Sequence, residues 1–518
     1  MKTKKLTESL DIALLLSILI YILLAVCLLP HYQYQLNPDG ISYMSIAQKY
    51  VSHDFSNAIN GYWGPLISWL MVPFLVVGFT PLIAANLLLI IIGLTVIIQS
   101  NVLIKILNIN MLLRFIVLSL IAIIVIYFVF DCISPDLLVV SISLALINKI
   151  LDSSLRKSKY AGLTFGLIGS CLYLAKSFGF PFFLASFLTI SLIFYYTSEN
   201  LIDRRRIAGN FISGFIVFLI ISGCWVLLIS HKYGIITIGT AGSYNRVLQE
   251  PNSLGHPMFY AGLLDPPNST AISIWEDVAS LKIKSWSIFD SYKTIIMELR
   301  VICRNLLSFL PILNEISFLS LSILLTGFVY LLQLGRQLIF DKLFYLLLIL
   351  GIMFLGYTLI AFDPRYTWLG NIIILIIGTK LLNLLFEKIP MKKISRIILI
   401  GFFIISFLVL PISSMYNSLN SGKPLFELST RLTKYNIHGR IASSNDWESS
   451  YYVSFHNGWQ YYGRSRNSSE SDVENELKNK SIDYYIVWES SENKINFLEK
   501  YPEITGGNIA GLKIYKLK

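Results

Sequence analysis

Asp39 is the first residue of the chain whose type and position suit catalysis. It lies in the segment NPDG at 37–40, directly after a long apolar run, and a weakly amphipathic stretch follows at 41–51. That pattern predicts a helix lying in a lipid–water interface. A carboxylate held there can take a proton from a hydroxyl that attacks a lipid-borne substrate. The alternative is a helix N-cap, worth about 1 kcal/mol, although Ser42 could act as the cap instead.

Two further acids stand in the short segment DCISPD, between two apolar runs. Asp131 and Asp136 frame a tight loop in which Pro135 favours a turn. One interpretation is structural, with Asp136 capping the helix that follows. The other is functional, because a second acid near Asp39 can orient an acceptor hydroxyl or help to hold a divalent cation. The sequence leaves these alternatives open.

Two cations stand at the ends of apolar runs where other basic residues are few. Lys176 lies in LAKSFGFP, and Arg365 precedes Tyr366 in FDPRYTWL. The planar fork of an arginine matches a phosphate group, and a lysine supplies a point charge. Such residues are candidates for binding a substrate phosphate. The structural alternatives are a snorkelling side chain at either position and a salt bridge between Arg365 and Asp363.

The long polar segment at 241–279 is rich in glycine, proline, asparagine and aromatic residues. It is too long for a simple connection and therefore suggests a functional loop. His256, Trp275, Glu276 and Asp277 are its candidates for binding a sugar or an acceptor, since an indole ring can stack on a pyranose face. A folded lid whose acids only cap helices is the alternative.

Composition assigns the chain to a class. It has 518 residues, of which 55% are hydrophobic and 14% charged, and its mean hydropathy is +0.64. That balance is typical of a polytopic membrane protein. The net charge of +11 lies in short clusters between apolar runs, a distribution typical of cytoplasmic loops rather than of a nucleic-acid groove. Those clusters occur at residues 2–5, 156–159, 204–206 and 388–396.

The apolar runs predict about eleven membrane spans, each near 20 residues long. They lie at 12–29, 81–107, 115–130, 137–151, 160–174, 182–196, 207–230, 316–332, 343–362, 368–385 and 397–411. The segment at 64–78 is short and contains Pro73, which favours a half-buried surface helix. The basic clusters place the N-terminus in the cytoplasm. The membrane domain is then 1–415, with extracytoplasmic loops at 31–80 and 231–300.

The C-terminal region, 416–518, differs in composition from the rest. From residue 440 it reads as strand, helix, strand, helix, strand, short helix and strand. That alternation predicts a small α/β domain. The span count places this domain outside the cell, on the same side as Asp39.

The order of these features resembles the GT-C superfamily of membrane glycosyltransferases. An acid stands in the first outer loop, a W-x-P-L segment follows at Trp63, a second acid lies in the next outer loop, and an R-Y pair comes late. Within the superfamily the chain is most similar to the protein-mannosyltransferase-like branch, which includes lipid A aminoarabinose transferases and prokaryotic members of unknown substrate. The resemblance covers residues 1–411.

The resemblance implies inverting transfer of a sugar from a polyprenyl-phosphate donor to a lipid, glycan or protein acceptor of the cell envelope. By position, Asp39 corresponds to the catalytic acid, and Arg365 with Tyr366 to the late motif. Many relatives carry two adjacent acids in the first loop, whereas Gly40 follows Asp39 here. Because of that departure, the resemblance does not extend to the type of acceptor or to the use of a metal. Chemically, a phosphate leaving group needs no protonation, so one base and a cationic clamp suffice.

A different class of protein must be weighed against an enzyme. A transporter or flippase of lipid-linked or envelope glycan precursors also has about a dozen spans. It usually shows internal repeats and ionisable residues in mid-span. This chain has neither pattern, and its charges gather at the ends of the apolar runs. We therefore expect a multi-pass enzyme of the plasma membrane that acts on membrane lipids and has no nucleic-acid partner.

Overall fold

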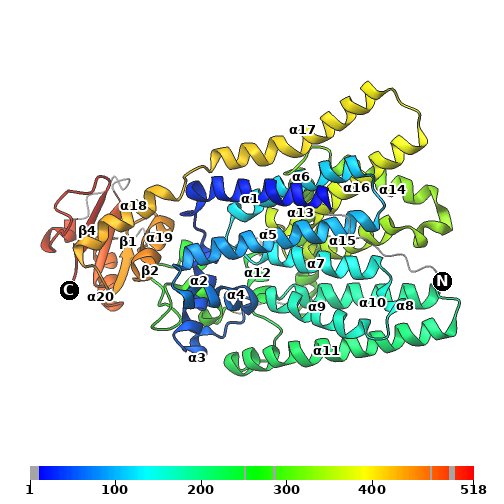
Figure 1. Ribbon diagram of the computed structural model, residues 1–518. Coiled ribbons are helices and arrows are strands. Elements are labelled where there is room, and N and C mark those ends of the chain that lie inside the picture. The colour runs from blue at the N-terminus through cyan, green and yellow to red at the C-terminus, as the bar shows by residue number, and fades with distance from the viewer. Residues whose placement is uncertain (1–10, 250–252, 284–286, 467–468, 489–495) are drawn as a thin grey trace.

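The computed structural model describes residues 11–249, 253–283, 287–466, 469–488 and 496–518. The basic cluster at 2–5 lies outside these ranges. A bundle of helices forms most of the molecule, and a small sheet stands at one end of the bundle (Figure 1). The α-helices are α1 (Ile12–Tyr32), α2 (Pro38–Val51), α3 (Phe55–Ala58), α4 (Pro65–Val77), α5 (Pro81–Ile106), α6 (Met111–Asp131), α7 (Asp136–Leu151), α8 (Ser154–Lys157), α9 (Ala161–Ala175), α10 (Gly179–Thr197), α11 (Leu201–Tyr233), α12 (Ala241–Leu248), α13 (Tyr292–Leu313), α14 (Ser320–Gln333), α15 (Lys342–Thr358), α16 (Trp368–Lys388), α17 (Lys393–Asn417), α18 (Lys423–Leu432), α19 (Trp447–Asn457) and α20 (Glu470–Asn479).

Short 3-10 helices and four strands complete the described elements. The 3-10 helices are η1 (Pro257–Phe259), η2 (Ile274–Leu281), η3 (Gly335–Phe340), η4 (Pro364–Thr367), η5 (Thr433–Tyr435) and η6 (Asn496–Lys500). The strands are β1 (Arg440–Ser443), β2 (Gln460–Arg464), β3 (Tyr484–Trp488) and β4 (Leu512–Lys516).

Seven of the expected spans are helices long and apolar enough to cross a membrane, within the described residues. They are α1, α5, α6, α10, α11, the continuous pair η4–α16, and α17. The protein is thus a polytopic helical membrane protein. The other four expected spans form α7, α9, α14 and α15, which have 16, 15, 14 and 17 residues. These are shorter than the roughly 20 residues of a full crossing, so the total of about eleven stays a prediction.

Helix α2 forms at the segment expected to lie in the interface, and the protein covers it more fully than one apolar face predicts. Nine of its 14 residues are buried, including the whole run from 40 to 47. It packs against α4 on one side, and η2 and α19 cover it elsewhere. The weak amphipathic pattern gave one apolar face, but segments far along the chain cover the remaining faces. Helix α4 forms where the short surface helix was expected and ends at Gly78, whose φ of 102° suits glycine.

The C-terminal sheet has the strand order β2-β1-β3-β4. Strand β1 pairs in parallel with β2 and β3, and β3 pairs antiparallel with β4. Each strand and helix expected after residue 440 is present in the expected order. Helix α17 runs along the bundle and leads through α18 into this domain (Figure 1).

The segment between η1 and η2 lies along the outer edge of the sheet. The Tyr461 amide donates a hydrogen bond to the Ile272 carbonyl at 2.7 Å, and the Leu264 amide donates to the Tyr462 carbonyl at 2.7 Å. The side chain of Gln460 also donates to three carbonyls between residues 268 and 271. Because β2 is an edge strand, these bonds satisfy backbone groups that would otherwise be unpaired. The loop and the C-terminal domain therefore form one unit.

Candidate functional site

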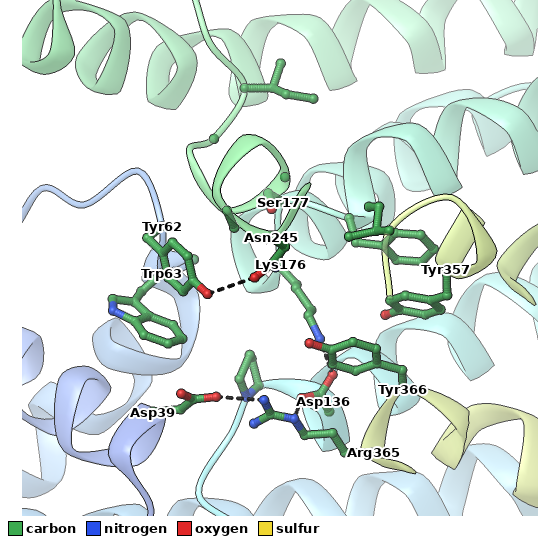
Figure 2. A pocket seen from close by; sticks show the side chains of 18 of the residues that line it. Asp39, Tyr62, Trp63, Asp136, Lys176, Ser177, Asn245, Tyr357, Arg365 and Tyr366 are labelled. Atoms are coloured by element: carbon green, nitrogen blue, oxygen red, sulfur yellow. Dashed lines mark hydrogen bonds and ion pairs between the residues drawn. The ribbon is translucent and has the colours of Figure 1, made fainter. Parts of the chain in front are cut away.

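Residues from widely separated parts of the chain line a cavity of about 190 Å³ near the sheet end of the bundle. Figure 2 shows Asp39, Asp136, Lys176, Arg365 and Tyr366 pointing toward one another. Asp39 comes from the first turn of α2, Asp136 from the start of α7, and Lys176 from the residue after α9. Arg365 and Tyr366 come from η4, just before α16. The structure thus brings together residues that are remote in sequence.

Asparagine 37 explains how α2 presents Asp39. The Asn37 side chain accepts a hydrogen bond from the Ile133 amide at 2.9 Å and donates to the Ile133 carbonyl at 3.3 Å. Gly40 permits this contact, because a Cβ there would lie 2.7 Å from the Ile133 Cβ. The start of α2 is therefore fixed against the loop that leads to Asp136.

Asp39 does not cap its helix. Asn37 occupies the N-cap position, and Ser42 donates its hydroxyl to the Pro38 carbonyl instead. The two carboxylate oxygens of Asp39 contact different partners: Oδ2 accepts from Nη2 of Arg365 at 2.7 Å, and Oδ1 accepts from the indole N–H of Trp275 at 3.1 Å. The carboxylate is thereby oriented from both sides and still faces the cavity.

Asp136 and Lys176 form a second ion pair in the same cavity. Their Oδ1 and Nζ atoms lie 2.6 Å apart, and Asp136 is buried, with 4% of its surface exposed. The Lys176 ammonium also lies 3.6 Å from the centre of the Tyr366 ring. Burial works against the charged ammonium, but the neighbouring Asp136 carboxylate outweighs it and raises the pKa of Lys176. Lys176 is therefore a fixed positive charge.

Arg365 stands among three carboxylates. Its Nη2 binds Asp39, while its Nε lies 3.7 Å from Asp136 and 3.3 Å from Asp363. The salt bridge with Asp363, weighed from the sequence, is thus present. The two Nε contacts are ion pairs without hydrogen-bond geometry, so the buried Nε–H makes no hydrogen bond within the described residues. A buried guanidinium N–H that lacks a well-aligned acceptor suits an anionic ligand.

Three of the four loop candidates, Trp275, Glu276 and Asp277, make separate contacts. Trp275 contacts Asp39, whereas Glu276 points away and forms a buried ion pair with Lys49 and accepts from the Ser45 hydroxyl at 2.6 Å. Asp277 accepts from the Tyr233 hydroxyl at 2.8 Å. Glu276 and Asp277 therefore anchor the loop and do not line the cavity.

Two other sequence candidates lie outside the cavity lining. His256 stacks on the Trp275 ring, with centroids 4.0 Å apart. Asp131 ends α6, and its carbonyl accepts a hydrogen bond from the Gln35 side chain at 3.4 Å. Of the two acids in the DCISPD segment, only Asp136 lines the site.

The acids present do not fit a divalent cation. Among the described residues, no three His, Cys, Asp or Glu side chains gather as metal ligands. Asp39 and Asp136 also lie within ion-pair distance of Arg365 and Lys176, so cationic side chains already neutralise them.

Several cavity residues carried no signal in the sequence. Tyr62 donates its hydroxyl to Asn245 at 3.3 Å across the cavity (Figure 2). Trp63, by contrast, is marked in the sequence by the W-x-P-L segment, and it donates its indole N–H to the Glu276 carbonyl at 3.0 Å. Tyr357 stacks on Tyr366, with centroids 4.7 Å apart. These contacts join loops and helix ends that have no periodic pattern.

No protein-family model matches the sequence, and no curated protein matches it.

Proposed function

We propose that the protein is a membrane glycosyltransferase. It moves a sugar from a polyprenyl-phosphate donor to a hydroxyl of a lipid, glycan or protein acceptor, with inversion at the anomeric carbon. The observation that carries the proposal is the meeting of Asp39 with Arg365 and Lys176 in one cavity. The resemblance of the membrane part to the GT-C superfamily supports the same reaction.

The cavity holds both a carboxylate and two cationic side chains, which supports the roles of base and phosphate-binding groups. Asp39 accepts the proton of the acceptor hydroxyl as its oxygen attacks the anomeric carbon. The bond between that carbon and the phosphate oxygen breaks, and the phosphate takes the electron pair. The guanidinium of Arg365 and the ammonium of Lys176, which both line the cavity, bind the departing phosphate. General-base help of this kind is worth about 10²–10⁴ in rate.

The donor phosphate also explains how Asp39 becomes available as a base. In the structure Arg365 pairs with Asp39 at 2.7 Å. A phosphate that binds Arg365 competes with this pair, since guanidinium–phosphate contacts are charge-assisted and often bidentate. Donor binding would then free Asp39 Oδ2 for the acceptor, while Trp275 keeps Oδ1 oriented.

The proposal includes an orientation. The basic segments near α8, at the α10–α11 junction and at the α16–α17 junction lie at the end of the bundle away from the sheet (Figure 1). By the positive-inside rule that end faces the cytoplasm. The cavity and the C-terminal domain are then extracytoplasmic, in a plasma membrane.

Transfer from labelled donors tests the proposal. Membranes containing the protein are incubated with a panel of radiolabelled polyprenyl-phosphate sugars, and the loss of label from the donor to any other lipid, glycan or protein is measured. Asp39→Asn should reduce this rate by about 10²–10⁴. Asp152→Asn, an exposed acid paired with Lys157, is the matched control and should not change it. Equal rates for Asp39→Asn and wild type would refute the enzyme; label that moves across the bilayer unchanged would indicate a transporter.

A further inference from the structure

A second cavity, of about 230 Å³, adjoins the first. It shares Tyr62 and Trp63 with the Asp39 cavity, so these two side chains form the boundary between the two spaces. Aromatic rings make up most of its wall. The rings belong to Tyr62, Trp63, Tyr244, His256, Phe259 and Trp275, and Leu248, Gly255 and Val278 complete the lining.

His256 provides one polar group of this wall, beside the hydroxyls of Tyr62 and Tyr244. Its side chain is buried, with 5% of the residue exposed. Nδ1 accepts a hydrogen bond from the Met258 amide at 3.1 Å, and burial lowers the pKa of the imidazole to about 3. The neutral ring must then carry its proton on Nε2. That nitrogen is buried and has no hydrogen-bond partner among the described residues. An unsatisfied buried donor is costly unless a ligand supplies an acceptor.

Trp275 links this cavity to Asp39. Its indole N–H holds Asp39 Oδ1 at 3.1 Å, and its ring forms part of the aromatic wall. The His256 ring stacks on Trp275 at 4.0 Å, and Trp447 of α19 also stacks on it, with centroids 5.6 Å apart and the planes at 7°. A molecule in the aromatic cavity would therefore contact Trp275, the same side chain that orients the Asp39 carboxylate.

We propose that the aromatic cavity binds a pyranose ring of the acceptor. Aromatic faces suit the C–H face of a sugar, and the His256 Nε2–H would donate to one of its oxygens. A purely apolar lipid chain would leave this donor unpaired. That the ring belongs to the acceptor rests on the proposed function. That the cavity binds a sugar does not.

Binding to the full-length protein tests the inference separately from catalysis. The protein is reconstituted in lipid nanodiscs, because many detergents carry sugar headgroups. The probes are methyl β-D-glucopyranoside, methyl β-D-galactopyranoside and methyl N-acetyl-β-D-glucosaminide, followed by saturation-transfer NMR and calorimetry. We expect at least one probe to bind.

Two substitutions locate the binding. His256→Phe keeps the ring and removes the N–H, and should weaken the probe by about tenfold. Leu248→Trp should block binding by filling the cavity. His456→Phe is the matched control, because His456 also has a buried Nε2 without a partner among the described residues and lies in a different, smaller cavity. It should bind like wild type.

The outcomes separate the two proposals. Farnesyl phosphate binding, measured on the same samples, reports the Arg365–Lys176 cavity and shows that each variant is folded. Sugar binding without farnesyl phosphate binding would refute the proposed donor site and leave the sugar cavity intact. Failure of every sugar probe would overturn the inference, and so would binding that both cavity variants leave unchanged.

Discussion

Arginine 365 is the residue on which the proposed phosphate chemistry depends most directly. Its guanidinium reaches Asp39 with one nitrogen and keeps a buried Nε–H free of hydrogen bonds within the described residues. A lysine at this position would keep the charge but lose the planar fork. The geometry of the donors, and not charge alone, should therefore determine how well the leaving phosphate is stabilised.

Arg365→Lys should lower the transfer rate at saturating donor by about 10²-fold, the usual cost of losing a preorganised donor to developing charge. Initial rates with the labelled polyprenyl-phosphate sugar test this. Arg396→Lys is the control, because Arg396 of α17 donates to the Phe386 carbonyl at 3.1 Å and does not line the cavity. A rate for Arg365→Lys equal to that of the control would exclude bidentate phosphate binding.

Residue type and local context were enough to select Asp39, Asp136, Lys176 and Arg365 from the sequence. Each is a charged residue at the end of an apolar run. Burying a charge near the membrane costs free energy, so such residues are candidates for function. Tyr62 could not be selected in the same way. Tyr62 belongs to the site because its hydroxyl contacts Asn245, 183 positions away. Nothing in the residues around either one predicts that contact.

At the scale of elements, the buried ion pair of Lys49 and Glu276 fixes η2 to α2. Both side chains are nearly inaccessible, and burial raises the pKa of Glu276 although Lys49 opposes this. Removing one member of such a pair leaves an uncompensated buried charge, which costs about 3–5 kcal/mol. The loop that carries Trp275 should therefore lose its anchor when Lys49 is replaced.

Lys49→Met should lower the midpoint of thermal unfolding, and more at pH 8 than at pH 5. Without Lys49 the folded-state pKa of Glu276 rises further above its ordinary value of 4.5. The folded protein then binds a proton that the unfolded chain has released, so stability declines as the pH rises through that interval. In the double variant Lys49→Met with Glu276→Gln, this additional pH dependence should vanish. An equal deficit at both pH values would contradict the explanation.

The predictability of the elements depended on how local their determinants are. Strands and helices after residue 440 followed from short patterns and turn residues, and they occur as expected. The burial of α2 did not follow, because α19 and η2 cover it from distant parts of the chain. The order β2-β1-β3-β4 likewise depends on pairing that no single strand encodes.

At the scale of the whole molecule, the distribution of charge predicts the orientation. Single cysteines placed at Lys157 and at Lys513 lie at opposite ends of the chain's fold, near α8 and in β4 (Figure 1). In intact cells, a membrane-impermeant maleimide should label the residue-513 cysteine and spare the one at 157. The native cysteines are first replaced by serine, and permeabilised cells give the maximum labelling of each site. The reverse pattern would place the cavity in the cytoplasm.

The hydrogen bonds between β2 and the 261–273 segment restrict how Trp275 can move relative to Asp39. Trp275 reaches Asp39 from a loop whose backbone is joined to the edge of the C-terminal sheet, and Trp447 of the same domain stacks on its ring. Local loop motion alone cannot withdraw the indole without breaking that edge. In the proposed reaction, access for a large acceptor would thus require the C-terminal domain to tilt as a body. A domain distant in sequence from Asp39 would then control entry to the cavity.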